Sequence, residues 1–293
     1  MTFQVRKAEF RLIPNIAFCG KSSSGKTYSA LLFARGYVGD QGKIVVIDTE
    51  NRRSEAYAND PEIGQFDIIE FTAPFTPERY IEAYEAACNH VGENGFVIID
   101  SASHEWEGQG GILEFADQQT NAKGQALSSA NKWNVPKRRH AKLVHRIANP
   151  IVPTIVCFRI KDKLIDVKNP QLGTTEEIVT EKNFHFDLTT IITLEPKTHK
   201  CTIQKLPKPL HGVAVQGCVI TKEMGAKYAQ VTKSGATGVN QNYAPIEDVY
   251  DKITKATTVA ELNAIYTENE NHPDKDSIVI ACTTRKQSLT EQA

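Results

Sequence analysis

A short glycine- and serine-rich segment, Gly20 to Thr27, has the residue types that hold a phosphate group. It reads Gly-Lys-Ser-Ser-Ser-Gly-Lys-Thr and matches the pattern G-x-x-x-x-G-K-[S/T] at every fixed position. Glycine and serine allow successive backbone N–H groups to turn inward around phosphate oxygens, and a helix that begins in the loop adds a partial positive charge. In this pattern Lys26 reaches the β- and γ-phosphates of the nucleotide, and the Thr27 hydroxyl ligates Mg²⁺. The residues predicted to bind ATP are Gly20, Lys21, Ser22, Ser23, Ser24, Gly25, Lys26, Thr27 and Tyr28.

Two carboxylates at the ends of apolar runs are candidates for metal binding and for activation of water. Asp100 ends the run 96–99, and we expect it to hold Mg²⁺ directly or through water. Glu50 closely follows the run 43–48, at the kind of strand end where α/β sheets place their ligand sites. A carboxylate there can orient water and accept its proton, so Glu50 is the candidate base, and a structural ion pair is its alternative role. The predicted catalytic residues are Glu50, Lys26 and Asp100, and the predicted metal ligands are Thr27 and Asp100.

The segments around these residues alternate between apolar runs of strand length and stretches with helical spacing. Strands alternating with helices predict a mostly parallel sheet that is covered on both faces. After about residue 163 the pattern changes, and we expect an antiparallel extension. Strands are predicted at 15–19, 43–48, 66–71, 95–100 and 153–160, helices at 26–37, 76–91 and 134–148, and antiparallel strands at 178–179, 186–194 and 200–205.

The predicted organisation is one α/β core with a small appendage. Residues 1–230 form the core, residues 231–244 a polar, glycine-containing linker, and residues 245–293 a small helical C-terminal segment. A chain of 293 residues fits this organisation and is long enough to bury a sizeable core without disulfides or metals.

Composition limits the classes of partner. The formal net charge is −1, so any nucleic-acid site would have to be a local basic patch. The six cysteines include no C-x-x-C pair, which predicts buried free thiols rather than a zinc or redox site. The sequence has neither a signal-peptide core nor an apolar run of about 20 residues. We therefore expect a cytoplasmic protein without membrane contact.

Three polar residues are candidate sensors of the γ-phosphate. His104 and Glu107 come just after Asp100, and Arg159 ends the apolar run 154–158. Because strand ends of a parallel sheet meet at one edge, we expect all three near the nucleotide. Packing or ion pairing within the protein is the alternative role for each.

Two basic segments are candidates for contact with nucleic acid. The run 137–146 would place several basic residues on one helical face, which could meet phosphates. Lysines also flank a Gly-Thr-Thr turn in the segment 161–182. An ordinary solvated surface is the alternative in both cases. The candidate DNA contacts are Lys161, Lys163, Lys168, Arg138 and Lys142.

These features together resemble the RecA-like ATPases of the P-loop class. In that family a glutamate at the end of the strand after the P-loop helix activates water, which here is Glu50, and a serine follows the metal aspartate, as Ser101 follows Asp100. The chain is more closely similar to a phage-encoded branch of AAA-type, RecA-like ATPases associated with single-strand annealing and recombination. The resemblance covers residues 12–205. It is carried by Gly-Lys-Thr-Tyr-Ser-Ala-Leu-Leu at 25–32, Asp-Thr-Glu at 48–50, Phe-Thr-Pro-Glu-Arg-Tyr at 75–80, Ile-Asp-Ser-Ala-Ser-His-Glu-Trp-Glu-Gly at 99–108, and the stretch 136–161.

The resemblance implies a RecA-like core that hydrolyses ATP with Mg²⁺ and binds single-stranded DNA in phage recombination or annealing. It also implies a homo-oligomer in the cytoplasm of a bacterial host cell, with a phage single-strand binding protein as a candidate partner. In RecA-like proteins a mobile DNA-binding loop follows the strand that corresponds to 154–158, so 161–182 is the expected DNA-contact segment. The branch has a Lys-x-Arg element near residue 205, where this chain has Lys205-Leu206-Pro207-Lys208, and a finger role for Lys205 or Lys208 stays open.

Two other functions are compatible with the phosphate loop. One is a ParA/MinD-like switch that dimerises on ATP, because that class carries a signature lysine at the position of Lys21. Glu50, the segment 104–108 and the lack of a basic or amphipathic terminal helix oppose this reading. The other is a non-catalytic, nucleotide-binding assembly module. Rates of ATP hydrolysis with and without single-stranded DNA distinguish the three functions. The sequence leaves open the oligomeric state and the choice between ATP and GTP.

Overall fold

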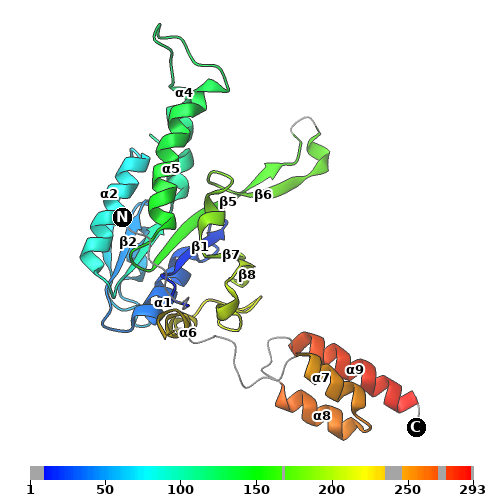
Figure 1. Ribbon diagram of the computed structural model, residues 1–293. Coiled ribbons are helices and arrows are strands. Elements are labelled where there is room, and N and C mark those ends of the chain that lie inside the picture. Colours follow the sequence, from blue (N-terminus) through cyan, green and yellow to red (C-terminus); the bar gives the residue numbers. More distant parts are fainter. Residues whose placement is uncertain (1–9, 167–168, 235–245, 270–274, 292–293) are drawn as a thin grey trace, which may run out of the picture. The chain divides into compact units, whose positions relative to one another are not determined.

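The computed structural model describes residues 10–166, 169–234, 246–269 and 275–291 (Figure 1). The chain divides into two compact units, Met1–Gly238 and Val239–Ala293. The first unit has an α/β fold with a mixed, mostly parallel sheet flanked by helices, and the second unit is helical.

An eight-stranded sheet forms the centre of the first unit. Its strands are β1 (Asn15–Gly20), β2 (Ile44–Asp48), β3 (Asp67–Glu70), β4 (Phe96–Asp100), β5 (Thr154–Leu164), β6 (Thr174–Ile178), β7 (Thr190–Leu194) and β8 (Cys201–Lys205). The order is β3-β2-β4-β5-β1-β7-β8, and β6 pairs with β5 outside this path. All neighbours from β3 to β7 in this order are parallel, whereas β8 and β6 are antiparallel to their partners. The carboxyl ends of β1, β2, β4 and β5 therefore meet at one edge of the sheet.

Helices cover both faces of this sheet. They are α1 (Lys26–Val38), α2 (Pro77–Val91), α3 (Ser103–Glu107), α4 (Ile112–Asp117), α5 (Asn134–Ala148) and α6 (Lys222–Ser234). Helices α1 and α6 pack on one face, and α2 and α5 pack on the other. In β1, Ile16 and Phe18 belong to the core under α1, while Ala17 and Cys19 belong to the core under α2. Burial on both faces explains why the strands are continuous apolar runs rather than alternating ones.

The antiparallel pairing predicted for the runs 186–194 and 200–205 is confirmed by β7 and β8, but the chain after β5 differs from the prediction in two details. Residues Phe184–Asp187 form a short 3-10 helix, and β7 runs parallel to β1 as part of the main sheet. The pairing begins where the Thr189 N–H donates to the Asn15 carbonyl oxygen at 2.8 Å. The parallel pairing of β7 with β1 was not predicted, because an apolar run carries no signal for the direction of its partner. The residues expected to form the linker also begin inside α6, which continues to Ser234, and 235–244 lie outside the described residues.

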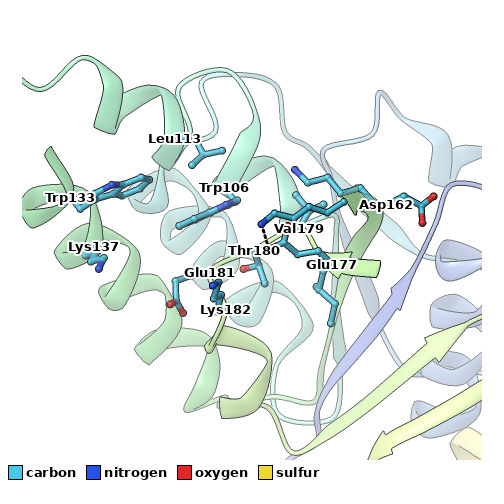
Figure 2. Close-up of a pocket in the computed structure, with 13 residues that line it drawn as sticks. Trp106, Leu113, Trp133, Lys137, Asp162, Glu177, Val179, Thr180, Glu181 and Lys182 are labelled. Atoms are coloured by element: carbon cyan, nitrogen blue, oxygen red, sulfur yellow. Dashed lines mark hydrogen bonds and ion pairs between the residues drawn. The ribbon is translucent and has the colours of Figure 1, made fainter. Parts of the chain in front are cut away.

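β5 continues beyond the sheet and forms a hairpin with β6 that projects from the body of the first unit (Figure 1). The paired residues run from Ile160 and Ile178 to Leu164 and Thr174. Residues at the base of the hairpin, together with residues of α3, α4 and α5, surround a cavity of about 510 Å³ (Figure 2).

The second unit confirms the prediction of a helical C-terminal region. Its helices are α7 (Ile246–Lys255), α8 (Val259–Glu268) and α9 (Lys275–Glu291). Val249, Ile253, Leu262 and Ile278 form a small buried core among them. Within the described parts of the chain, no helix combines the length and the apolar character needed to cross a membrane.

Candidate nucleotide-binding site

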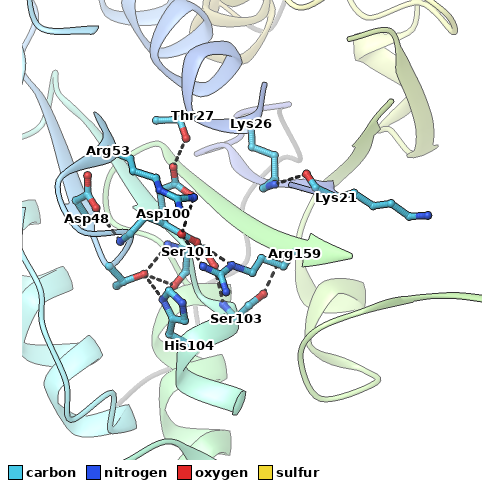
Figure 3. Close-up of polar contacts among 12 residues, drawn as sticks. Lys21, Lys26, Thr27, Asp48, Arg53, Asp100, Ser101, Ser103, His104 and Arg159 are labelled. Carbon is cyan, nitrogen blue, oxygen red and sulfur yellow. Dashed lines mark hydrogen bonds and ion pairs between the residues drawn. The ribbon is translucent and has the colours of Figure 1, made fainter. Parts of the chain in front are cut away.

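The predicted phosphate loop connects β1 to α1. Gly25 has a φ of +83°, in the left-handed region that glycine adopts without steric cost, and α1 begins at the next residue. The Lys26 ammonium donates hydrogen bonds to the carbonyl oxygens of Gly20 and Lys21, at 2.9 Å each. Figure 3 shows the bond to Lys21. The lysine charge and the start of the helix therefore both act on the space above the loop, which favours an anion there.

Thr27 and Asp100, the two predicted Mg²⁺ ligands, are in contact. The Thr27 hydroxyl donates a hydrogen bond to Asp100 Oδ2 at 2.5 Å (Figure 3). Burial raises the pKa of the Asp100 carboxyl to about 6, although the Thr27 hydrogen bond opposes the shift. A hydroxyl and a carboxylate are oxygen donors that Mg²⁺ prefers, and the ion keeps waters and phosphate oxygens as its other ligands. The pair therefore fits a complex of Mg²⁺ with a nucleotide.

Asp48 supports the turn that carries Glu50. Its carboxylate accepts hydrogen bonds from the Glu50 N–H at 2.8 Å, and from the N–H and hydroxyl of Ser54 at 3.0 and 2.5 Å. Asp48 is buried, and these bonds all fix the turn after β2. Its role is therefore structural, and Glu50 is the carboxylate of this strand end that reaches the site.

Glu50 and Arg159, the candidate base and a candidate sensor, form one ion pair. Arg159 donates from Nε to Glu50 Oε1 at 2.9 Å and from Nη2 to Oε2 at 2.5 Å. Arg53 lies 3.6 Å from the same carboxylate. The side chain of Glu50 is only 12% exposed, so the pair is held at the wall of the site rather than in open solvent. Both roles considered for Glu50 are compatible with this geometry, because the carboxylate is paired with Arg159 and also lines the cavity.

The other two candidate sensors occupy different places. His104 Nδ1 lies 2.7 Å from the Thr49 hydroxyl, and its ring stacks on Phe75 with centroids 4.9 Å apart. Burial lowers the pKa of His104, so the neutral ring is favoured. Glu107 lies at the cavity and accepts a hydrogen bond from Lys161 at 2.8 Å. Glu107 is therefore the better placed of the two to meet a ligand.

These groups surround a cavity of about 530 Å³ at the carboxyl edge of the sheet. Its lining combines the phosphate loop, both acidic strand ends and one aromatic ring. Predicted residues in the lining are Ser22, Ser23, Gly25, Lys26, Thr27, Glu50, Asp100, Glu107, Arg159 and Lys161. The lining also includes Arg53 and Tyr57, which the sequence reasoning missed. Both lie on a short 3-10 helix after Glu50, and nearness to Glu50 is the one signal that could have suggested them.

Lys21 faces away from the cavity although it belongs to the loop. Its ammonium pairs with Asp162 at 2.8 Å and with Glu176 at 3.0 Å, on the two strands of the β5–β6 hairpin. These contacts tie the phosphate loop to the hairpin. The position corresponds to a surface ion pair rather than to a lysine that reaches a phosphate.

Three further predicted loop residues are absent from the lining of this cavity. Gly20 ends β1 and contributes a carbonyl to Lys26. Ser24 is buried, and its hydroxyl has no hydrogen-bond partner among the described residues. Tyr28 packs against Tyr57, with ring centroids 5.3 Å apart. Tyr28 therefore supports the ring that lines the cavity and does not face a ligand itself.

The hairpin lysines proposed as DNA contacts carry ion pairs of their own. Lys161 pairs with Glu107 at 2.8 Å, and Lys163 pairs with Glu177 at 3.0 Å. Lys168 lies outside the described residues. The segment 161–182 thus includes a paired β-hairpin, which corresponds to the surface alternative for this segment rather than to the mobile loop that the resemblance implied.

The basic helix α5 presents only part of its charge to solvent. Arg138 and Lys142 are exposed. Arg139 is instead held by Glu78, with the shorter contact at 2.5 Å. A basic face therefore exists on α5, but it is narrower than the sequence run.

Neither lysine considered for a finger role lines the candidate nucleotide cavity. Lys205 donates hydrogen bonds to the carbonyl oxygens of Phe186 and Leu188, at 2.6 and 2.7 Å. Lys208 is exposed on a short 3-10 helix. Lys205 thus holds the chain that leads into β7.

Comparison with known proteins gives little beyond this geometry. No family model matches the chain. Residues of this chain are 28% identical over 107 residues to the 1,4-alpha-glucan-branching enzyme 1, chloroplastic/amyloplastic, of Pisum sativum. The match covers 36% of this chain and 12% of that enzyme. The chain therefore spans about one eighth of the length of the relative it matches, and a local similarity of this extent does not define a family.

Proposed function

We propose that this chain is a RecA-like P-loop ATPase that needs Mg²⁺. The observation that supports this most is the contact between Thr27 and Asp100 at 2.5 Å, beside Lys26 and within the lining of one cavity. Residues from two separate strand ends and a loop thus meet where a nucleotide phosphate and its metal would lie. The RecA-like assignment rests on the resemblance in sequence and on the position of Glu50.

Hydrolysis would proceed by in-line attack of water on the γ-phosphorus: the new P–O bond forms as the bond to the β–γ bridging oxygen breaks, and ADP leaves. Bound Mg²⁺ would neutralise charge on the β- and γ-phosphate oxygens. Lys26 would add positive charge on the same oxygens as negative charge develops on the leaving phosphate. Glu50 would orient the water and accept its proton once Arg159 has moved away from its carboxylate. The anion best placed to draw Arg159 away would be the γ-phosphate, because Arg159 lines the cavity that we propose for the nucleotide.

The nucleotide base has an aromatic partner available. Tyr57 lines the cavity, and Tyr28 packs behind it. A tyrosine face held in this way offers an offset-stacking surface to a purine ring. The choice of ATP over GTP is assigned by the resemblance in sequence.

The cellular activity we propose is ATP hydrolysis coupled to single-stranded DNA, in phage recombination or annealing. This part rests on the resemblance, which also suggests a homo-oligomer and a phage single-strand binding protein as partner. The β5–β6 hairpin adds one structural argument. Lys21 and Lys161 connect its base to the phosphate loop and to Glu107, so a ligand on the hairpin has a path to the nucleotide.

We expect the purified chain to hydrolyse ATP in the presence of Mg²⁺ and to do so faster when single-stranded DNA is added. Release of phosphate is measured with Mg²⁺, with EDTA, and with single-stranded or duplex DNA. No hydrolysis in any condition, with tight binding of ATP, would favour the non-catalytic assembly module. If added DNA does not change the rate of hydrolysis, the proposed coupling to DNA is overturned and the proposed ATPase activity is retained.

Replacing Lys21 with alanine tests the ParA/MinD-like alternative. Because the lysine pairs with Asp162 and Glu176 on the surface, its loss should change ATP affinity and turnover by less than about 3-fold. A signature lysine acting on phosphates would make the same change far more costly. Titration with a fluorescent ATP analogue and a turnover assay measure both quantities, and a large loss of turnover would favour the dimerisation switch.

A further inference from the structure

The two tryptophans of the chain, Trp106 and Trp133, lie together on the wall of the cavity of about 510 Å³ at the base of the β5–β6 hairpin (Figure 2). Their rings are nearly parallel, with an interplanar angle of 15° and centroids 6.0 Å apart. Trp106 comes from α3, and Trp133 immediately precedes α5. Both side chains are half-buried and line the cavity, so part of each aromatic surface is open to a ligand.

Buried contacts fix the position of Trp106. Its ring packs edge-on against His140, with centroids 5.5 Å apart. His140 Nδ1 in turn lies 3.0 Å from both carboxylate oxygens of Glu105, and both residues are buried. An aromatic ring that is held in place loses little conformational entropy when a second ring stacks on it. The tryptophan wall is therefore formed before any ligand arrives.

The lining of this cavity has uncommitted positive charge. Lys137 and Lys182 line it, are exposed, and have no ion-pair or hydrogen-bond partner among the described residues. The acidic residues of the lining are engaged elsewhere: Asp162 with Lys21, Glu177 with Lys163, and Glu181 with the backbone N–H of Asn183. A ligand that combines planar rings with negative charge fits this arrangement.

The cavity continues along α5. A neighbouring hollow of about 530 Å³ is lined by residues of α5 and of the segment that follows β6, and it shares Lys137 and Glu181 with the first. The linings of the two hollows together include residues from Trp133 to Asn149, which span the whole of α5. Because the two hollows follow one another along a single helix, they suit an extended polymer ligand.

We propose that the groove formed by these two hollows binds a single-stranded nucleic acid, with bases stacked on Trp106 and Trp133 and phosphates held by Lys137 and Lys182. The inference rests on the proposed function only in taking single-stranded DNA as the physiological strand. Stacking on an aromatic ring tolerates any base and needs an unpaired one, whereas duplex bases present only their edges. The hairpin segment 161–182 has lysines but no aromatic residue, so the two tryptophans supply the stacking surfaces for the bases.

The groove is connected to the nucleotide cavity. Lys161 and Val179 line both cavities. On α3, Glu107 lines the nucleotide cavity while the adjacent Trp106 lines the groove. The phosphates of a bound nucleotide would attract Lys161 and repel Glu107, which would break their ion pair, so occupancy of one site can alter the other.

The two tryptophans make a direct test possible, because intrinsic tryptophan fluorescence reports on this groove alone. The full chain, without nucleotide, is titrated with an oligo-dT strand, with an abasic strand of the same length, and with dTMP. We expect strong quenching by oligo-dT and little by the abasic strand, which offers phosphates without bases. Quenching by dTMP at the same nucleotide concentration as strong as that by oligo-dT would assign the site to free nucleotides and overturn the proposal.

Variants separate stacking from charge, with binding followed by the anisotropy of a labelled oligo-dT. Trp106→Ala and Trp133→Ala should each weaken binding by about 5- to 150-fold, and Trp133→Phe by less, because a smaller ring remains. Lys137→Ala with Lys182→Ala should lower the slope of log affinity against log salt by about 1.4. The matched control is Lys197→Ala with Lys227→Ala, which removes the same charge from exposed positions outside both cavities and should leave the slope unchanged.

The outcomes separate this inference from the proposed function. One contrary outcome is that anisotropy shows binding without tryptophan quenching, and that Trp133→Phe and both tryptophan-to-alanine variants bind with wild-type affinity. The strand would then bind elsewhere, which overturns the inference and leaves the proposed ATPase unaffected. If oligo-dT quenches the fluorescence as expected but the protein never hydrolyses ATP, the groove is supported and the proposed ATPase function is overturned. No binding of oligo-dT by either measurement overturns the groove and the DNA coupling together.

Discussion

Replacing Lys26 with alanine is expected to abolish tight binding of ATP. The ammonium lies across the phosphate loop, 2.9 Å from the carbonyl oxygens of Gly20 and Lys21, and no other lysine of the loop faces the cavity. Removing one partner of a hydrogen-bonded charge pair in such a site costs about 2–5 kcal/mol, roughly 30- to 4,000-fold in the dissociation constant. Titration with a fluorescent ATP analogue measures the loss.

Two companion variants show whether the loss belongs to the phosphate contact. Lys26→Arg keeps the charge but replaces a compact ammonium by a planar fork, so it should recover only part of the affinity. Lys21→Ala removes a lysine of the same loop that faces Asp162 and should bind ATP as the unmodified chain does. A folded Lys26→Ala protein with unchanged affinity would mean that Gly20 to Thr27 does not hold a phosphate.

The local features of the site could be predicted because each is determined by a short, continuous segment of the sequence. The loop pattern fixes the types of Gly25, Lys26 and Thr27, and two apolar runs each lead to a carboxylate. A parallel α/β arrangement then places these strand ends at one edge. The contact between Thr27 and Asp100 follows from that rule without any knowledge of the partner strands.

The contacts between distant segments could not be predicted in the same way. Glu50 and Arg159 were both candidates, but nothing in either segment indicates that the two would pair with each other. Trp106 and Trp133 stack only because α3 and α5 meet beside the hairpin. The direction of β7 likewise depends on its pairing with β1, since a buried strand has the same apolar pattern in either direction.

Replacing Glu50 with glutamine is expected to keep ATP binding and to lower turnover by about 10²- to 10⁴-fold, the range for loss of a positioned base. Glutamine has the same shape and can still accept a hydrogen bond from Arg159, so the fold and the cavity should persist. It cannot accept a proton from the attacking water. Affinity is measured by titration with the fluorescent analogue, and turnover by release of phosphate at saturating ATP and Mg²⁺.

The matched control is Glu107→Gln, because Glu107 is the other glutamate that lines the same cavity. Its carboxylate already accepts a hydrogen bond from Lys161 at 2.8 Å, and its side chain is 30% exposed, against 12% for Glu50. A more exposed, differently paired carboxylate should contribute less to turnover, so we expect this variant to lose far less activity. Loss of turnover in Glu107→Gln with near-normal turnover in Glu50→Gln would move the base to Glu107. The bidentate pair of Glu50 with Arg159 would then be a structural ion pair at the cavity wall, the alternative that the sequence left open.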